Sequence, residues 1–557
     1  MKTKNIIYLL TIACTAFLFA CNDFLNTTPN DRITGGSLTN GNLAALTAPL
    51  YNKVWFDFNG QFYYGLGDGM AYNLNAPYSD YIYPFADFSV TGLTGPLVNA
   101  WSSFYQVIQQ SNVVIKSINL SNADESSMQQ YIAEARFMRG LAYWHLASLW
   151  QDAIISDDPT PLATNPVVNL NPRKDVYEFA IRDMEFAAKY LPETSTQAGR
   201  VNRYSAFGML SRFYLAYSGL VASDYGNNPN VGTRDQTYLD LAKKAAEMVI
   251  NKGPFKLMNN YPDLFKIENN NNPESLFAFQ WIPGLNSSNG SGVINTQQAY
   301  FAFSSLVTGD DAAWGGGGTG CPYDMAKEYE LNDTIRRKAT WMGNGDYYPE
   351  ISKSNGGLTY NEATFSAAPR WLSVKKGVTG SNKDNPAIGR MNSDLDNYML
   401  RLAEIYLNYA EAILGNNAST SDETALEYFN KVRTRAGMPP KTSIAYEDLR
   451  HERRVEFCME GRYWYDLVSR AYYKQQEVLD YINNEQNRGT VINYLFDAPN
   501  SLRVDPDRSP GARPVGKASP ATFKLPYPES ESIQNPLLGE APVPYTFTED
   551  KITDLFN

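Results

Sequence analysis

Residues 398–414 read YMLRLAEIYLNYAEAIL, and a second helical segment follows at 424–436. The second segment carries Ala425, Phe429 and Val432 at three- and four-residue spacing, which places them on one face of a helix. Small residues at such positions let two helices approach closely, as in the second helix of a tetratricopeptide repeat. The two segments therefore predict a packed pair of helices.

Further pairs of helical segments lie outward from this one along the chain. They are 131–150 with 175–191, 204–219 with 238–252, and a fourth candidate that begins at Tyr446 and runs through 452–470. Four pairs without one fixed period are typical of a degenerate α-superhelix that is interrupted by insertions. Unrelated helical hairpins are the alternative interpretation.

The segment between the second and third pairs has a different character. Runs such as Asn269–Asn272 and Gly315–Gly318 break any helical period, and apolar stretches there are short. We therefore predict a mainly α fold: a tetratricopeptide-like α-superhelix of about four helix pairs, with a large irregular, loop-rich insertion that contains a few short strands. Residues 51–105 look similarly irregular, and the proline-rich stretch 485–545 should wrap the surface.

The N-terminus reads as an export signal. Lys2 and Lys4 precede an apolar run at 6–20, which is too short to span a bilayer comfortably as a helix. The run ends at Leu18-Phe19-Ala20-Cys21, which looks like a bacterial lipobox whose Cys21 is acylated after cleavage. An ordinary signal peptide with an incidental cysteine is the alternative. Stable anchoring needs more than one acyl chain, so a lipobox predicts a tethered protein outside the cytoplasm.

These patterns divide the chain into five parts. They are a lipoprotein signal peptide (1–20), a tether (21–43), an N-terminal helical part with the first two pairs (44–254), the loop-rich insertion (255–396), and the C-terminal pairs with the proline-rich tail (397–557).

Composition argues against one class of partner and indicates the roles of the cysteines and of His145. A formal charge of −11 and a pI near 5.0 argue against nucleic acid as a partner, since a polyanion attracts basic surfaces. Only Cys321 and Cys458 follow the lipobox region. We favour two free thiols over a disulfide, since a chain of this size can form a hydrophobic core without a stabilising disulfide. His145 lies among Tyr and Trp in a helical pattern, where a packed structural role is favoured over a catalytic one.

Several stretches together resemble one family. In chain order they are Trp101-x-x-x-Tyr105, the run 134–143 (EARFMRGLAY), Leu149-Trp150-Gln151-Asp152, the run 401–412 (RLAEIYLNYAEA), the run 432–439 (VRTRAGMP), the runs 452–457 (ERRVEF) and 460–467 (EGRYWYDL), and 525–531 (LPYPESE). Each is weak alone, but their order and spacing resemble the SusD/RagB family of outer-membrane nutrient-binding lipoproteins from Bacteroidota.

The resemblance implies a function as well as a fold. Members of this family are non-catalytic, lipid-anchored proteins at the cell surface. They bind oligosaccharides, or peptides in some members, and deliver them to a SusC-like TonB-dependent outer-membrane transporter. A peptide-binding member of the family, or a helical scaffold that binds proteins, stays open as an alternative.

Enzyme motifs give little support to catalysis. The sequence contains no G-x-S-x-G, H-E-x-x-H or G-x-x-x-x-G-K-[ST] motif. Glu456 and Glu460 lie one helical turn apart among arginines, which favours ion pairing within a helix over a glycosidase acid/base pair. We expect no catalysis and no cofactor, although oxygen ligands at 268–272 permit a structural calcium.

A sugar site needs exposed aromatic rings beside polar side chains, because a pyranose has an apolar face ringed by hydroxyl groups. Two loop segments supply this mixture, and by resemblance the family's glycan arc is built from loops in these regions. The candidate ligand-binding residues are Asn75, Tyr78, Asp80, Tyr81, Tyr83, Trp281, Tyr300, Trp314 and Trp341, with no metal ligand among them. Two or three such rings predict a dissociation constant between ~1 mM and ~1 μM.

Overall fold

The computed structural model describes residues 38–51, 53–75, 81–195, 197–281, 295–302, 320–361, 372–386, 388, 393–497, 500–508, 510–512, 515–549 and 551–556. The signal peptide, Cys21 and most of the predicted tether lie outside these ranges. None of the helices in the described part is long and apolar enough to cross a membrane.

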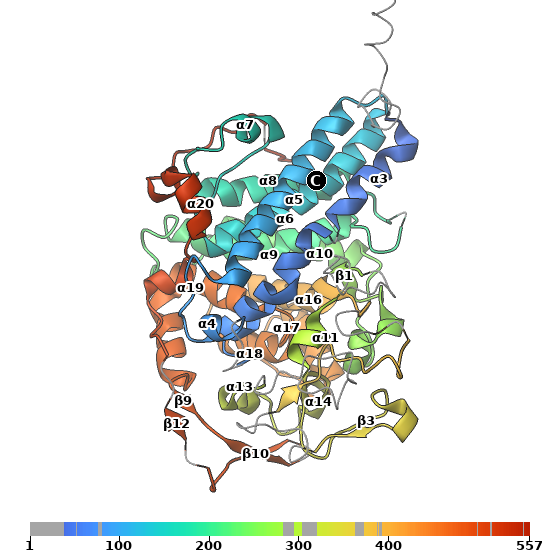
Figure 1. The fold of residues 1–557 in the computed structure, drawn as a ribbon, viewed down its shortest axis with the longest axis vertical. Coiled ribbons are helices and arrows are strands. Elements are labelled where there is room, and N and C mark those ends of the chain that lie inside the picture. The colour runs from blue at the N-terminus through green and yellow to red at the C-terminus, as the bar shows by residue number, and fades with distance from the viewer. Residues whose placement is uncertain are drawn as a thin grey trace, which may run out of the picture.

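The first half of the chain forms long helices that pack side by side (Figure 1). Helix α6 (Glu125–Leu149) packs on α8 (Arg173–Tyr190), which confirms the first predicted pair. Helix α5 (Gly95–Asn119) covers α6 from the other side, so the expectation of irregular structure up to residue 105 is wrong for 95–105. The buried residues Leu97, Trp101 and Phe104 follow helical spacing, so this aromatic-rich stretch forms the buried face of a helix.

The remaining predicted pairs are also present. Helix α9 (Arg203–Ala222) packs on α10 (Gln236–Lys252), and α16 (Leu402–Leu414) packs on α17 (Glu423–Arg435). The fourth candidate is two helices, α18 (Tyr446–Glu456) and α19 (Tyr463–Asp480). Helix α18 ends at Glu456, and the turn that leads to α19 contains Met459 and Gly461 at positive φ.

The quoted stretch 398–414 is not helical throughout. Its first residues belong to β6 (Asn397–Arg401), which pairs antiparallel with β1 (Ser275–Phe279) of the insertion. Phe277 lies opposite Leu400, and all five residues of β6 are buried. Pairing with a distant segment therefore overrides the helical pattern at this end, and α16 begins only at Leu402.

The insertion contains short elements, as predicted. They are η7 (Tyr261–Phe265), η8 (Ile267–Asn269), β1, α11 (Gln297–Phe301), α13 (Tyr323–Glu328), α14 (Thr334–Thr340), η9 (Lys353–Asn355), and the antiparallel pairs β2 (Trp341–Met342) with β5 (Ser373–Val374) and β3 (Tyr347–Tyr348) with β4 (Leu358–Thr359).

The N-terminal segment before α5 is built of short turns of helix. They are η2 (Asn40–Asn42), α3 (Leu43–Thr47), η3 (Ala48–Leu50), η4 (Lys53–Trp55), the π-helical turns η5 (Phe58–Phe62) and η6 (Gly65–Met70), and α4 (Tyr83–Ala86). Other short elements are α7 (Pro159–Thr164) and the pair β7 (Ser419–Thr420) with β8 (Ile444–Ala445).

The C-terminal tail first forms strand pairs at the lower end of the molecule, where Tyr494 bonds to Cys321 and Leu372, and then runs along the surface of the helical part (Figure 1). The Trp150 indole donates to the Pro526 carbonyl at 2.8 Å, and the Val543 amide donates to the Leu170 carbonyl at 2.7 Å. The tail's elements are η10 (Tyr481–Glu485), β9 (Thr490–Val491) with β12 (Gly511–Ala512), β10 (Tyr494–Asp497) with β11 (Ser501–Val504), η11 (Pro520–Phe523), α20 (Glu529–Gln534) and η12 (Pro536–Gly539). The tail is thus extended over the surface, and it also contains two antiparallel strand pairs.

Candidate functional site

The two loop segments predicted to build the ligand site meet in space. Asn75 forms an isolated antiparallel bridge with Gly320, with backbone N–H to carbonyl distances of 3.0 and 2.9 Å. The rings of Tyr81 and Tyr300 contact each other edge to face, with centroids 5.8 Å apart. Residues more than 200 positions apart in the chain therefore share one surface, which we call the tyrosine ledge and define by Asp57, Gln61, Tyr81 and Tyr300.

The ledge combines rings with polar groups. Tyr81 is 42% exposed and Tyr300 is half-buried, so both side chains keep surface that a ligand could contact. The Gln61 side chain hydrogen-bonds to the Tyr300 hydroxyl. Desolvation raises the pKa of Tyr300, and the neighbouring Tyr81 and Asp57 add to that shift, so the phenol stays protonated and can donate a hydrogen bond at neutral pH.

Asp57 and Gln61 were not foreseen from the sequence. They lie four positions apart at the start of and within η5, between buried aromatic residues such as Phe58 and Phe62. Two polar side chains four positions apart in an aromatic-rich segment are the sequence pattern that could have pointed to this part of the ledge. Desolvation raises the pKa of Asp57, whose side chain lies at the surface.

Three residues expected to be exposed are buried. Trp341 is 0% exposed at the start of β2, and Trp281 is 6% exposed with its indole N–H donating to the Asn397 carboxamide oxygen at 2.8 Å. Asn75 is also fully buried at its bridge. In this conformation Trp341 and Asn75 have no accessible surface to offer a ligand, and Trp281 has very little.

The other predicted site residues fall in two groups. Tyr83 begins α4 and is half-buried close behind Tyr81 in the sequence. Tyr78, Asp80 and Trp314 lie outside the described residues, so their part in a ligand site stays a prediction.

The carboxylate pair Glu456 and Glu460 lies inside an ion-pair cluster. Arg401 contacts Glu456 at 2.6 Å and Glu460 at 2.9 Å, and Arg435 and Arg336 also pair with Glu456. Burial alone would raise the pKa of Glu456, but the guanidinium groups lower it to about 2. Ion pairing is therefore confirmed, but not within one helix: Glu460 lies in the turn after α18, and the partners come from β6, α14, α17 and Lys376.

The cysteines and His145 are packed in the interior. Cys321 and Cys458 are free and buried, as favoured from the sequence. The His145 Nδ1 lies 2.8 Å from the Tyr465 hydroxyl, and burial together with the charges of Arg212 and Arg462 lowers its pKa. These observations confirm a structural role for His145.

A calcium site at 268–272 finds no further support in the described part of the chain, where no group of three or more His, Cys, Asp or Glu side chains could hold a metal ion. The Asn270 amide donates to the Asp394 carbonyl, and the Asn272 amide donates to the Asn269 carbonyl at 3.1 Å. These side chains hold loops together.

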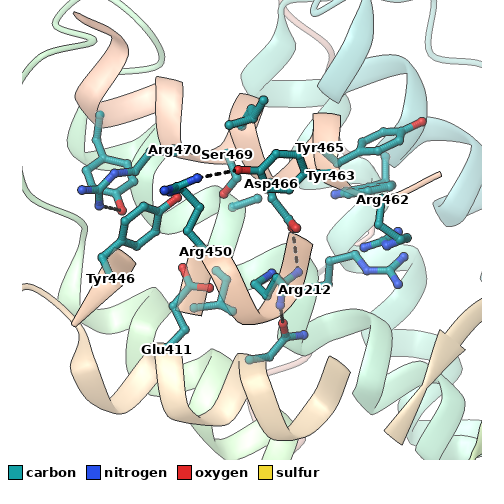
Figure 2. A pocket seen from close by; sticks show the side chains of 17 residues that line it. Arg212, Glu411, Tyr446, Arg450, Arg462, Tyr463, Tyr465, Asp466, Ser469 and Arg470 are labelled. Carbon is teal, nitrogen blue, oxygen red and sulfur yellow. Dashed lines mark hydrogen bonds and ion pairs between the residues drawn. The ribbon is translucent and has the colours of Figure 1, made fainter. Parts of the chain in front are cut away.

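A small pocket lies within the helical part, among α9, α16, α18 and α19 (Figure 2). Arginines dominate its walls: Arg453 pairs with Asp466 at 2.6 Å, and Arg450 donates to the Tyr463 hydroxyl at 3.1 Å. Its volume of about 40 Å³ suits a few water molecules and not a sugar ring. We therefore exclude this pocket as the ligand site.

The architecture defines a helical-repeat protein whose irregular insertion and N-terminal segment meet at a surface that carries Tyr81 and Tyr300. A family model described as the SusD family matches residues 273–542, and one described as starch-binding associating with outer membrane matches residues 73–215. A SusD-like protein of Bacteroides ovatus is 40% identical over 572 residues, which cover 99% of this chain and 99% of the relative. The chain belongs to the SusD family.

Solved structures agree with this assignment. A crystal structure of a protein with a xylogluco-oligosaccharide is 40% identical, has a TM-score of 0.82 and covers 91% of this chain and 100% of that one. Surface glycan-binding protein A from Bacteroides thetaiotaomicron, in complex with laminarihexaose, has a TM-score of 0.67 at 18% identity. It covers 89% of this chain and 98% of that one, and at this identity it supports the fold alone.

Proposed function

We propose that this protein is a non-catalytic, cell-surface lipoprotein that binds oligosaccharides and delivers them to a SusC-like TonB-dependent transporter. The tyrosine ledge carries the proposal, because it places two accessible rings beside a carboxylate and an amide where two loop regions meet. The 40% identical structure with a xylogluco-oligosaccharide makes a neutral glucan of that kind the first ligand to test.

The small area of the ledge predicts weak, reversible binding of a glycan. Covering about 60–80 Å² of one tyrosine ring contributes about 1.5–2 kcal/mol. Two rings, less the cost of ordering the glycan, give an affinity in the micromolar to millimolar range. Binding of this strength allows release into a transporter.

Calorimetric titration with a xylogluco-oligosaccharide tests the binding step. We expect Tyr81→Ala and Tyr300→Ala each to weaken binding about tenfold, since each removes one stacking surface. Tyr81→Phe should retain most of the affinity because it keeps the ring. Tyr347→Ala, which removes another exposed ring away from the ledge, is the matched control and should bind as the wild type does.

Two outcomes would refute the sugar part of the proposal. One is an absence of binding to every neutral oligosaccharide while a peptide binds. The other is equal affinity for the wild type and the ledge variants.

The remaining parts of the proposal have their own tests. Chromatography of the glycan after long incubation should show unchanged chain length, whereas turnover that vanishes in Glu456→Gln would establish a hydrolase. Protease treatment of intact cells should remove the protein, whereas survival would favour a periplasmic scaffold. Mass spectrometry of the mature N-terminus should find acylated Cys21, and purification from detergent-solubilised membranes should bring a TonB-dependent barrel with it.

A further inference from the structure

A buried arginine of the C-terminal tail contacts the segment that carries Tyr81. Arg488 lies in the turn between η10 and β9 and is 5% exposed. Its Nη2 donates to the Met70 carbonyl at 2.7 Å, and its Nη1 donates to the Ala86 carbonyl at 3.1 Å. Met70 is the last residue of η6, and Ala86 is the last residue of α4. One guanidinium group therefore joins the C-terminal ends of η6 and α4.

The two carbonyl groups need a donor from outside their own elements. The last carbonyl groups of a helix have no N–H partner within that helix. A cation near this end is also favoured by the helix dipole. The guanidinium group is planar and presents its N–H groups in a fixed fork, so it can donate to both carbonyls at once. Arginine suits this position because a single donor could satisfy only one of the two ends.

The position of the guanidinium group is itself fixed by its neighbours. The Arg488 Nε donates to the Gln486 side-chain oxygen at 2.7 Å, and the Gln486 amide donates to the Ala71 carbonyl at 3.1 Å. Asn487, between these two residues, has a φ of 47°, a left-handed conformation in which asparagine is enriched. The guanidinium carbon lies 4.4 Å from the centroid of the Phe88 ring. The turn therefore directs two side chains toward the same segment.

The arginine forms these bonds without an ion pair. No carboxylate among the described residues pairs with Arg488, and the nearby Asp324 pairs with Arg454 at 2.7 Å. Burial lowers the pKa of Arg488 to about 9. Burying a charged group without a counter-charge costs free energy, which its hydrogen bonds must offset. The contacts that Arg488 makes with η6 and α4 are therefore the main return for placing a charge there.

The contact between η6 and α4 sets the position of Tyr81. A Cβ on Gly65, the first residue of η6, would lie 2.9 Å from the Tyr81 carbonyl oxygen, and a Cβ on Gly69 would lie 3.3 Å from the Ile82 side chain. The Ala86 amide donates to the Ile82 carbonyl at 3.0 Å, so Tyr81 leads directly into α4. Because the backbone of η6 packs on these residues, a shift of either turn moves the Tyr81 ring relative to the rest of the ledge.

We propose that Arg488 is a positioning residue for the tyrosine ledge: by joining η6 to α4, it holds the Tyr81 ring against Tyr300, where both rings can contact a glycan. Arg488 is buried and touches no ligand itself. The inference rests on the proposed glycan binding at the ledge, and it adds a residue more than 400 positions from Tyr81 that sets the geometry of that site.

Calorimetric titration with a xylogluco-oligosaccharide tests the effect on binding. We expect Arg488→Met, which keeps an unbranched side chain and removes every N–H donor, to weaken binding about tenfold, as Tyr81→Ala does. Arg488→Lys keeps the charge but loses the fork, so its affinity should lie between those of the wild type and the methionine variant. The lysine variant carries the test if the methionine variant does not fold.

The matched control is a second buried arginine that donates to a helix end. Arg234 is also 5% exposed, and it donates to the Gly415 carbonyl, at the end of α16 in the helical part, at 2.7 Å. Arg234→Met should therefore lower stability and bind the glycan as the wild type does. A loss of affinity equal to that of Arg488→Met would overturn the inference, because loss of any buried arginine would then have the same effect.

A double substitution separates positioning from general stabilisation. In a Tyr81→Ala protein the ring is already absent, so adding Arg488→Met should weaken binding by no more than about a further twofold. A further loss of about tenfold would show that Arg488 does not act through Tyr81, and it would overturn the inference.

Amide hydrogen exchange followed by mass spectrometry tests the same contact without a ligand. Arg488→Met should speed exchange about tenfold in peptides that cover 66–72 and 82–89, while peptides from α9 and α10 keep the wild-type rates. Wild-type rates in the first two peptides, or equal acceleration throughout the chain, would overturn the inference. If the wild type binds no glycan, the proposed function fails, and the exchange rates still decide whether Arg488 holds η6 against α4.

Discussion

At the scale of single residues, Asp68 shows how one carboxylate can join distant parts of the chain. It accepts hydrogen bonds from the backbone N–H groups of Met459 at 2.9 Å and Gly461 at 2.8 Å, almost 400 positions away. The Asn73 amide donates a third bond at 3.2 Å. These bonds fix the turn between α18 and α19 against η6, beneath the loops that lead to the ledge.

Replacing Asp68 should therefore destabilise the fold. We expect Asp68→Ala to lower the free energy of unfolding by about 2–3 kcal/mol, because two buried N–H groups lose their acceptor. Urea denaturation followed by circular dichroism measures the change. Asp240→Ala, at an exposed position of α10, should stay within about 0.5 kcal/mol of the wild type. Equal effects of the two substitutions would contradict the role given to Asp68.

At the scale of elements, the approach of α6 and α8 depends on a small residue. A Cβ on Gly140 would lie 3.0 Å from the Ala180 carbonyl oxygen and 3.0 Å from the Asp183 Cβ. Asp183 also receives Arg136 and Arg139 of α6, each at 2.7 Å. Close backbone contact and buried ion pairs thus set the same helix spacing, which fixes the first pair of the superhelix.

A larger residue at this contact should push the two helices apart. We expect Gly140→Val to cost about 1–3 kcal/mol of stability through overpacking. Thermal and urea denaturation both report the change. Gly95→Ala provides the control, because nothing lies within 4 Å of its added Cβ and it occupies the first turn of α5. A valine variant as stable as the control would show that the helices can separate without loss.

At the scale of the whole molecule, stability should depend on pH in two directions. Burial raises the pKa of Asp68 to about 6 and of Glu185 and Asp396 to about 7, above ordinary values of 3.8 and 4.5. The folded state then binds protons more readily than the unfolded state. Stability from these groups is present at low pH and is lost as the pH rises toward 7.

Other carboxyl groups act in the opposite sense. Burial alone would raise the pKa of Glu404, Glu456 and Glu328, but neighbouring arginines lower each to about 2 from an ordinary value of 4.5. Their contribution is complete above pH 4.5 and is lost as the pH falls toward 2. The first set starts to lose its contribution above pH 3.8–4.5, so the two sets together place the stability maximum between about pH 4 and pH 4.5.

Urea denaturation midpoints measured from pH 2 to pH 8 test this expectation. The midpoint should rise from pH 2 to about pH 4–4.5 and decline from there to pH 7. Glu185→Gln, which can still accept from the Tyr214 hydroxyl, should flatten the decline between pH 5 and pH 7 without changing the acid side. A midpoint that rises steadily up to pH 7 would contradict the raised pKa values.

Most of the superhelix could be predicted because its signal is local. Small and apolar residues at helical spacing, as at Ala425, Phe429 and Val432, mark a helix wherever they occur. The prediction was wrong where distant partners decide: residues 397–401 form a strand because β1 pairs with them. It was also wrong at 95–105, where aromatic residues hid the regular spacing of α5.

The candidate site could be predicted in its regions and not in its residues. Tyr81 and Tyr300 come together at the surface, whereas Trp341 and Trp281 turn inward, although all four looked alike as aromatic residues in loops. The sequence by itself determined the helical pairs and the family, because helical periodicity and motif order are properties of neighbouring residues. Only the tertiary structure decided which rings face solvent, because exposure depends on segments that meet across hundreds of positions.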